Sequence, residues 1–211
     1  MNEEILTPVL DWLDLAGVAI FALTGALVAA KEKQTLVTLS FFALITGVGG
    51  GTIRDLLIEA PVFWIADPWV AAICLGMALF AWFTPTRWWE GRFLSIVDGL
   101  GLAAYAVLGT AKALEYGVPP VPAFLMGVIT GCAGGIIRDV IAGRPSILMR
   151  PELYVTAAAL SAALTVAGGL AGFERWYVWI AATVAGFGLR LAAIRWNLAL
   201  PAYDERGASK E

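Results

Sequence analysis

The sequence predicts an all-α integral membrane protein of seven transmembrane helices. Three observations lead to this prediction: the composition, the spacing of long apolar runs, and an internal repeat. Of the 211 residues, 60% are hydrophobic and 15% are charged, and the mean hydropathy is +0.79. A soluble domain carries about 45–50% apolar and about 25% charged residues. The excess lies in long runs, as is typical of membrane-spanning helices.

Composition also excludes several classes of protein. The net charge of −3 leaves no excess of basic residues for binding nucleic acid. Cys74 and Cys132 lie inside apolar runs, so we interpret them as small buried hydrophobes rather than a disulfide or a metal site. The chain has no His, the commonest general base and metal ligand. We therefore expect no enzymatic activity, no bound metal and no cofactor.

Seven apolar runs are long enough to be considered as spans, because about 20 residues cross the hydrocarbon core as a helix. In order they cover residues 13–30, 36–58, 69–83, 93–114, 121–142, 153–170 and 177–196. The turns between them are short and hold most of the prolines and charges. No linker separates soluble domains, so residues 1–203 are expected to form one transmembrane domain and residues 204–211 a polar tail.

The basic residues predict the orientation. Seven spans place the termini on opposite sides of the membrane. With the N-terminus outside, the inner side holds Lys31, Lys33, Arg87, Arg92, Arg144, Arg150, Arg195, Arg206 and Lys210. The outer side holds Lys112 and Arg175, which is a strong positive-inside asymmetry. All nine Trp residues fall near the predicted helix ends, as in an aromatic belt. We expect a bacterial inner membrane protein with its C-terminus in the cytoplasm.

The first and fourth spans begin an internal repeat at an offset of 84 residues. Asp14, Gly17, Ala19, Ala22 and Gly25 recur as Asp98, Gly101, Ala103, Ala106 and Gly109. The second and fifth spans continue it, because ITGVGGGTIRD at 45–55 recurs as ITGCAGGIIRD at 129–139. Matching Gly, Arg and Asp residues in one ungapped register are not explained by a hydrophobic composition.

Each repeat holds three spans, so the second repeat would enter the membrane from the opposite face. Repeat one covers about residues 10–85 and repeat two about residues 93–170. This inverted-repeat architecture is typical of transporters whose pathway lies near the midplane between discontinuous helices. The extra helix at about 177–197 has no partner and is expected to pack outside the repeats as a brace.

Glycines at the centres of the second and fifth spans predict breaks in both helices. They are Gly49, Gly50 and Gly51 in the second span and Gly134 and Gly135 in the fifth. Each glycine costs a helix about 1 kcal/mol relative to Ala, and exposed backbone is tolerated in a membrane only beside water or protein. The alternative is close helix packing, because the small-xxx-small spacing also occurs in both spans, at Gly47 and Gly51 and at Gly127, Gly131 and Gly135.

An Arg–Asp pair follows each glycine segment: Arg54–Asp55 and Arg138–Asp139. A charge at the centre of a membrane helix costs about 2.5–3.5 kcal/mol, so these groups must pair, reach water or snorkel. In one interpretation the arginines brace the helices through ion pairs with Asp14 and Asp98. In the other, which is compatible with the first, the two pairs flank a glycine-lined ion path on its outer and inner sides.

Two further polar features lie within the spans. Thr46 and Thr130 precede the expected breaks, where their hydroxyl oxygens and freed carbonyls would be hard ligands suited to a monovalent cation. Arg190 in the seventh span lies near the inner helix end and is expected to snorkel.

The doubled GGxxRD segment in a three-plus-three-plus-one helical chain resembles the bacterial relatives of the trimeric intracellular cation (TRIC) channels. That family is also similar to bacterial proteins described as glycine transporters. The resemblance covers nearly the whole chain. It implies a homotrimer in the lipid membrane, with a potassium pore in each protomer between the kinked second and fifth helices. Carried over, residues 49–51 form the first kink and Ala133, Gly134 and Gly135 the second, where one glycine is replaced.

Two functions remain open. The first is a monovalent cation channel, with potassium or sodium as the permeant ion and bound lipid as a further ligand. The second is a secondary transporter of a small zwitterion such as glycine, in which Arg and Asp would bind carboxylate and ammonium. An enzyme is disfavoured, because Ser40, Ser95 and Ser161 have no base in the sequence beside them.

Overall fold

The computed structural model describes residues 3–89, 92–149 and 151–201, with the side chains from Asp14 onward except that of Thr86. The predicted polar tail at 204–211 lies outside the described residues. The same holds for three residues of the predicted inner side and for the side chain of one belt residue: Arg150, Arg206, Lys210 and Trp12.

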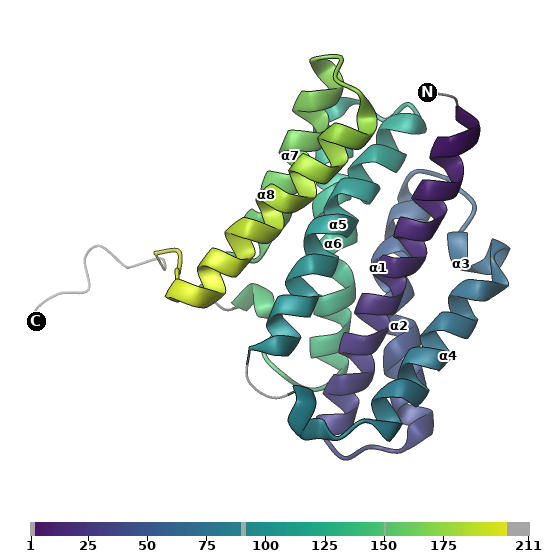
Figure 1. Cartoon of the computed structure of the whole chain (residues 1–211), viewed down its shortest axis with the longest axis vertical. Coiled ribbons are helices and arrows are strands. Elements are labelled where there is room, and N and C mark those ends of the chain that lie inside the picture. The colour runs from purple at the N-terminus through teal and green to yellow at the C-terminus, as the bar shows by residue number, and fades with distance from the viewer. Residues whose placement is uncertain (1–2, 90–91, 150, 202–211) are drawn as a thin grey trace, which may run out of the picture.

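Eight α-helices make up the described part of the chain (Figure 1). They are α1 (Glu3–Lys31), α2 (Leu36–Leu57), α3 (Phe63–Ala66), α4 (Pro68–Phe83), α5 (Phe93–Glu115), α6 (Pro120–Ile141), α7 (Val155–Leu170) and α8 (Arg175–Trp196). Two 3-10 turns lie at Thr86–Trp89 and Ile147–Met149. All seven predicted helices are present. The short α3 was not predicted, because four residues carry too little periodicity to be recognised.

The helices fall into two length classes. Within the described chain α1, α2, α5, α6 and α8 are long and apolar enough to cross a membrane. The third and sixth predicted spans are the shorter α4 and α7, of 16 residues each. At 1.5 Å per residue each is about 24 Å long, less than a hydrocarbon core of about 30 Å. Five spans are therefore full-length and two are short.

Local sequence signals account for several helix starts. The hydroxyl of Thr35 accepts a hydrogen bond from the backbone N–H of Thr38 at 3.3 Å and so caps α2. Asp67 accepts from the N–H of Trp69 at 2.9 Å, with Pro68 at the first position of α4. Such caps satisfy amides that have no partner within the helix.

The packing divides the helices into two groups of three. α1 packs against α2 and α4, and α5 packs in the same way against α6 and α7. Contacts of α1 with α5 and of α2 with α6 join the groups, and α8 packs outside against α5 and α7. In Figure 1 the turn after α1 and the start of α5 lie at the same end, so these two helices run in opposite directions.

Equivalent residues meet where α1 crosses α5. Phe21 and Tyr105 are 84 residues apart in sequence, and their rings pack edge to face with centroids 5.3 Å apart. The aromatic ring of each lies against a glycine of the opposite helix, Tyr105 against Gly17 and Phe21 against Gly101. The two glycines thus make room for a reciprocal aromatic contact between the two groups of helices.

The predicted glycine breaks are wrong. Both α2 and α6 are uninterrupted helices through their glycine segments. The close-packing alternative describes the structure, because the missing side chains let α2 and α6 approach each other. Burial against the facing helix offsets the cost of glycine, so the backbone has no need to leave helical geometry.

Candidate ion pathway

A glycine–threonine crossing, which we call the waist, lies where α2 meets α6. A Cβ atom added at Gly50 would overlap the carbonyl oxygen of Thr130, and one added at Gly134 would lie 2.5 Å from the carbonyl oxygen of Thr46. The two contacts are equivalent at the offset of 84. A Cβ at Gly49 would lie 2.9 Å from the Cδ1 atom of Ile137. The backbones of α2 and α6 are therefore in direct contact at the waist, with no open space between them there.

The threonine hydroxyls do not point across this waist. The Thr130 hydroxyl donates to the carbonyl of Met126 within α6 at 2.6 Å and packs against Gly109 of α5. The Thr46 hydroxyl packs against Gly25 of α1, and it has no hydrogen-bond partner within the described chain. The sequence interpretation required freed carbonyls beside these hydroxyls. Because α2 and α6 are unbroken helices, the expected breaks do not supply such carbonyls.

The first charge cluster, which we call the outer cluster after the side on which the sequence predicts it, lies near the end of α2 and holds Arg54, Asp55 and Lys112. Arg54 Nε and Lys112 Nζ both donate to Asp55 Oδ1, each at 2.8 Å. The second carboxylate oxygen of Asp55 accepts the backbone N–H of Phe63 at 3.0 Å. Arg54 is 1% exposed and Asp55 fully buried, whereas the Lys112 side chain is 26% exposed. Two cations thus share one carboxylate oxygen.

The second charge cluster, which we call the inner cluster after its predicted side, lies near the end of α6 and holds Arg138, Asp139, Asp98 and Thr24. Arg138 Nε donates to Asp139 Oδ1 at 3.0 Å, and its Nη1 donates to Asp98 at 2.6 Å and to the Thr24 hydroxyl at 3.1 Å. Asp139 Oδ2 accepts the backbone N–H of Ile147 at 3.2 Å, which matches the contact of Asp55 with Phe63. Here one guanidinium faces two carboxylates.

The two clusters differ because their equivalent partners differ. Asp98 pairs with Arg138, but Asp14 makes no ion pair with any described residue and lies only within electrostatic range of Arg54. The Nη2 atom of Arg54 has no hydrogen-bond partner within the described chain. Its Cζ atom lies 5.8 Å from the centre of the Phe63 ring. The predicted Asp–Arg bracing is therefore present in the inner cluster alone.

A small cavity of about 90 Å³ adjoins the inner cluster. It is lined by Asp98, Arg138 and Asp139 together with Ser95 and Arg144. Arg144 pairs in turn with Glu32 of the turn after α1. The inner arginine and its carboxylates therefore face a polar space, which fits the end of a pathway as well as a structural ion pair.

Arg190 of α8 does not snorkel to water as the sequence suggested. It is 1% exposed, and its Nη2 atom donates to Glu152 at 2.7 Å. Its guanidinium lies 5.3 Å from the centre of the Tyr154 ring. Arg190 thus joins α8 to the segment just before α7, and these contacts do not involve the residues of the waist.

Sequence reasoning missed Lys112 and Thr24 as parts of the clusters. Lys112 had been counted among the outer basic residues, although Asp98, Tyr105 and Lys112 recur at seven-residue spacing on one face of α5. Thr24 carried no signal, because its equivalent in the second repeat is Leu108.

Within the described chain no group of three or more Cys, Asp or Glu residues is arranged to hold a metal ion.

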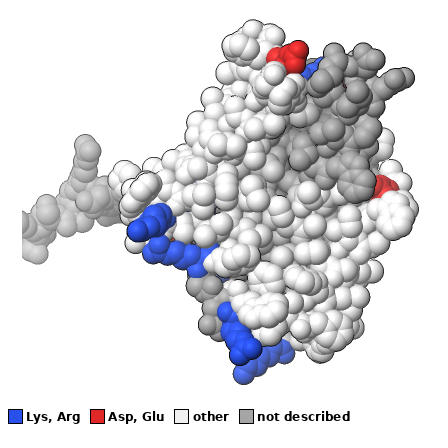
Figure 2. Space-filling view, in the orientation of Figure 1, with Lys and Arg blue, Asp and Glu red and all other residues white. Residues whose placement is uncertain are grey.

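Exposed basic residues gather at one end of the bundle. Figure 2 shows most Lys and Arg of the visible face at the end where α8 finishes and the α1–α2 turn lies. Exposed members of this set are Lys31, Lys33, Arg87, Arg92 and Arg195. An apolar all-α bundle with buried charge clusters at both ends of a two-helix crossing is a membrane protein of the channel and transporter class.

Comparison with known proteins identifies the family. Residues 11–86 and 95–168 match the family described as glycine transporter. The chain belongs to this family, whose members include prokaryotic homologues of the TRIC channels. The predicted resemblance to the TRIC family is thereby confirmed.

Three similar proteins illustrate the relationship. A UPF0126 membrane protein of Vibrio cholerae is 37% identical over 203 residues, which cover 93% of this chain and 84% of that protein. The UPF0126 inner membrane protein YadS of Escherichia coli is 36% identical over 209 residues, covering 93% and 98%. The crystal structure of the TRIC trimeric intracellular cation channel orthologue from Rhodobacter sphaeroides is 41% identical, with a TM-score of 0.84, and covers 90% and 99%.

Proposed function

We propose that this protein is a monovalent cation channel, selective for potassium, with a pore in each protomer between α2 and α6. The observation that carries the proposal is the waist, where two backbones meet through glycine with a charge cluster on either side. The relationship to a TRIC cation channel orthologue at 41% identity supports it. On this proposal Thr46, Thr130 and Gly49, Gly50, Gly51, Gly134 and Gly135 line the path.

Opening requires α2 and α6 to separate at the waist. Only glycine permits the closed contact, and on separation the same surface becomes a path lined by the backbone oxygens of Thr46 and Thr130. Oxygen atoms of this kind replace the hydration shell of a permeating cation. On this proposal the pore is closed when the glycines of α2 and α6 are in contact and open when the two helices separate. The glycines then act by allowing this contact, not by kinking the helices.

The inner cluster favours cations over anions. Arg138 remains protonated at any physiological pH, so its charge must be neutralised if potassium is to pass. Asp98 and Asp139 both bind it, and the cluster keeps one formal negative charge in excess. The cavity beside it gives this charge access to polar surroundings. A cation entering from the inner end would thus be attracted rather than repelled.

The outer cluster is the more restrictive end. Arg54 and Lys112 compete for one oxygen of Asp55. A cation approaching Asp55 must displace or pass Lys112, the more exposed of the two. This asymmetry makes Lys112 the residue that would control cation entry from the outer side.

A second candidate is secondary transport of a small zwitterion. The description of the matching family as glycine transporter favours it. Adjacent guanidinium and carboxylate groups in both clusters would suit the carboxylate and ammonium of glycine. The two functions differ in whether transport can run against a gradient.

The arrangement in the membrane follows from the same relationships. We propose two inverted three-helix repeats with α8 as the extra helix, the N-terminus outside and the C-terminus in the cytoplasm. The basic end in Figure 2 is then the inner end. The bacterial inner membrane and a homotrimer are supported by the E. coli and R. sphaeroides relatives, which are described as an inner membrane protein and a trimeric channel.

Reconstitution into liposomes and planar bilayers tests the function. The purified protein should give currents in symmetric potassium chloride that reverse near the potassium potential when a gradient of potassium salt is imposed. Glycine should not accumulate against its gradient under any ion gradient. Uphill glycine uptake without measurable current would instead establish the transporter and retire the channel proposal.

A further inference from the structure

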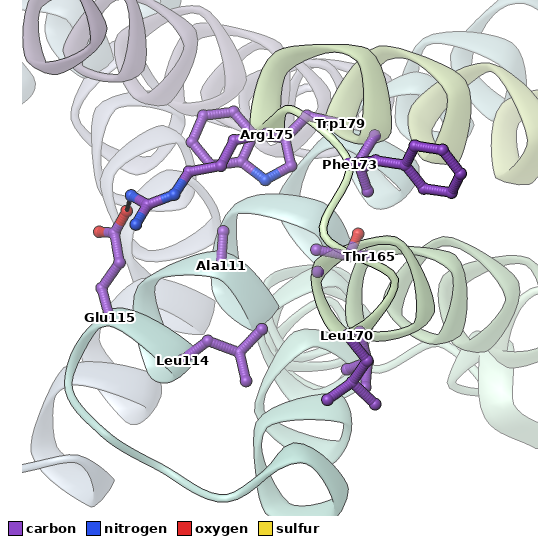
Figure 3. Close-up of a pocket in the computed structure, with 11 residues that line it drawn as sticks. Ala111, Leu114, Glu115, Thr165, Leu170, Phe173, Arg175 and Trp179 are labelled. Carbon is purple, nitrogen blue, oxygen red and sulfur yellow. Dashed lines mark hydrogen bonds and ion pairs between the residues drawn. The ribbon is translucent and has the colours of Figure 1, made fainter. Parts of the chain in front are cut away.

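We propose that a cavity between α5, α7 and α8 binds one acyl chain of a phospholipid, while Arg175 and Glu115 at its mouth bind a phosphoethanolamine headgroup. The cavity has a volume of about 320 Å³ (Figure 3). It lies at the end of α5 and the start of α8, opposite the end where most of the exposed basic residues gather (Figures 1 and 2). Its volume is at the small end of the range of about 300–1,000 Å³ for ligand pockets. It has room for one chain rather than a whole lipid.

The cavity lies beside the last turns of α7, close to the turn that joins α7 to α8. α7 ends at Leu170 and α8 begins at Arg175, and the last residues of α5 up to Glu115 line the same space. Gly168 packs against Val178 of α8, but a Cβ at the neighbouring Gly169 would meet no other atom. No side chain of the described chain therefore fills the space beside Gly169. In a bilayer its apolar lining is best covered by hydrocarbon, since water gains no partners there.

Aromatic residues place the mouth at the depth of the lipid headgroups. Trp176 and Tyr177 at the start of α8 stack on each other, and the exposed Phe173 lies in the turn before them. Trp and Tyr gather at membrane–water interfaces. The charged mouth is thus level with headgroups, and the cavity extends toward the hydrocarbon past Thr165 and Trp179.

The charges at the mouth determine the headgroup. Arg175 Nη1 donates to Glu115 Oε1 at 2.9 Å, and their side chains are 62% and 38% exposed. Exposed ion pairs add little to folding, so this pair can exchange for a ligand. Arg175 would bind a phosphate through two N–H groups, and Glu115 would accept from a primary ammonium. Phosphatidylglycerol has no ammonium, and the ammonium of phosphatidylcholine has no N–H to donate.

Native mass spectrometry of the delipidated oligomer tests the headgroup without any variant. Phosphatidylethanolamine, phosphatidylglycerol and phosphatidylcholine of the same chain length are titrated separately. We expect one phosphatidylethanolamine per protomer, bound about tenfold more tightly than the others, which is about 1.4 kcal/mol. Glu115→Gln, at an exposed position, should remove this preference. Equal affinity of the wild-type protein for all three lipids would overturn the proposal.

A cavity-filling variant tests the site itself. Gly169→Phe should lower the affinity for phosphatidylethanolamine about tenfold, again about 1.4 kcal/mol. Gly188→Phe is the matched control, because Gly188 is also an exposed helical glycine with open space around its Cβ but does not line the cavity. Unchanged lipid binding by Gly169→Phe would overturn the proposal. So would a changed oligomer mass with lipid binding intact, which would make the cavity an interface between copies. Neither result bears on the channel.

Discussion

At the scale of single residues, the two buried arginines are stabilised in different ways. Arg138 is bound by the carboxylate of Asp139 in its own helix, by that of Asp98 in α5 and by the Thr24 hydroxyl in α1. Among the described residues Arg54 pairs with Asp55 alone, and it shares that carboxylate oxygen with Lys112. The inner arginine is therefore firmly held, whereas the position of the outer one depends on a lysine that water can reach.

The inner cluster yields a prediction of opposite-signed effects. Arg138→Ala should raise potassium current, because it removes the positive charge from beside the path and leaves two carboxylates. Asp139→Asn should lower the current, since it weakens one of the pairs that hold Arg138 aside but keeps an oxygen for the N–H of Ile147. Single-channel recording in planar bilayers measures both.

Folding must be checked in the same preparations. Removing one partner of a buried ion pair costs about 3–5 kcal/mol. A purely structural pair would therefore show both variants losing thermal stability and current together. Such same-signed loss, with a changed oligomer mass, would contradict the proposed role of Arg138 beside the path.

The outer cluster yields a second prediction. Lys112→Met keeps most of the side-chain volume and leaves the Arg54–Asp55 pair in place. It should raise inward potassium current, and more strongly at low ionic strength, where charges are less screened. Lys112→Arg keeps the charge and is the control, with current near that of the wild-type protein. Equal currents for Lys112→Met and Lys112→Arg would show that this charge does not govern entry.

At the scale of elements, the contact of α2 with α6 joins the two groups of helices, and it is the contact that the proposed channel would have to open. Its glycines cost helix stability locally, yet each helix is continuous. The loss is offset where Gly50 meets the carbonyl of Thr130 and Gly134 meets that of Thr46.

A methyl group at the waist should hold α2 and α6 apart. Gly50→Ala would place its Cβ against a backbone oxygen that cannot rotate away, and overpacking of this kind costs about 1–3 kcal/mol. Thermal unfolding in detergent should show the loss, and bilayer recording should show a raised open probability.

Gly76→Ala in α4 provides the matched control for the waist variant. A Cβ at Gly76 meets no atom, so the better helix propensity of Ala should stabilise the protein by about 0.5–1 kcal/mol. Equal unfolding temperatures for Gly50→Ala and Gly76→Ala would contradict the close contact at the waist.

At the scale of the whole molecule, the proposed orientation can be tested by labelling. Arg87→Cys should react with an impermeant thiol reagent from the cytoplasmic side only, and Glu115→Cys from the outer side only. Both positions are exposed, whereas the native Cys74 and Cys132 are buried and should stay silent. Lys33 is a poorer choice than Arg87, because its φ of 54° is strained for an ordinary side chain. Labelling of both positions from one side would exclude the proposed topology.

The oligomer is the other prediction at this scale. Large apolar side chains such as Phe83, Val121 and Ile180 are exposed on the isolated chain, and lipid or neighbouring protomers must cover them. Multi-angle light scattering in detergent should give the mass of a homotrimer after correction for bound detergent. A monomer or dimer mass at all protein concentrations would rule out the trimer.

The sequence by itself determined the class of protein, the seven longer helices and the positions of the two Arg–Asp pairs. These are properties of short segments: an apolar run of about 20 residues forms a helix in a membrane regardless of its neighbours. The repeat at an offset of 84 residues can also be read from the sequence without the fold. It makes Asp55 equivalent to Asp139, and Phe63 equivalent to Ile147. These equivalences reappear as matching hydrogen bonds.

Only the tertiary structure decided whether the glycines break their helices and which carboxylate holds each arginine. The local cost of glycine predicts a break, but contact with a helix 84 residues away offsets that cost. Whether two charged side chains form an ion pair depends on how the helices that carry them pack. Asp98 pairs with Arg138, whereas the equivalent Asp14 does not pair with Arg54, which is bound by Asp55 instead. Lys112 belongs to the outer cluster for the same reason. Its side chain reaches Asp55 of α2 only because α5 and α2 lie close together in the folded chain.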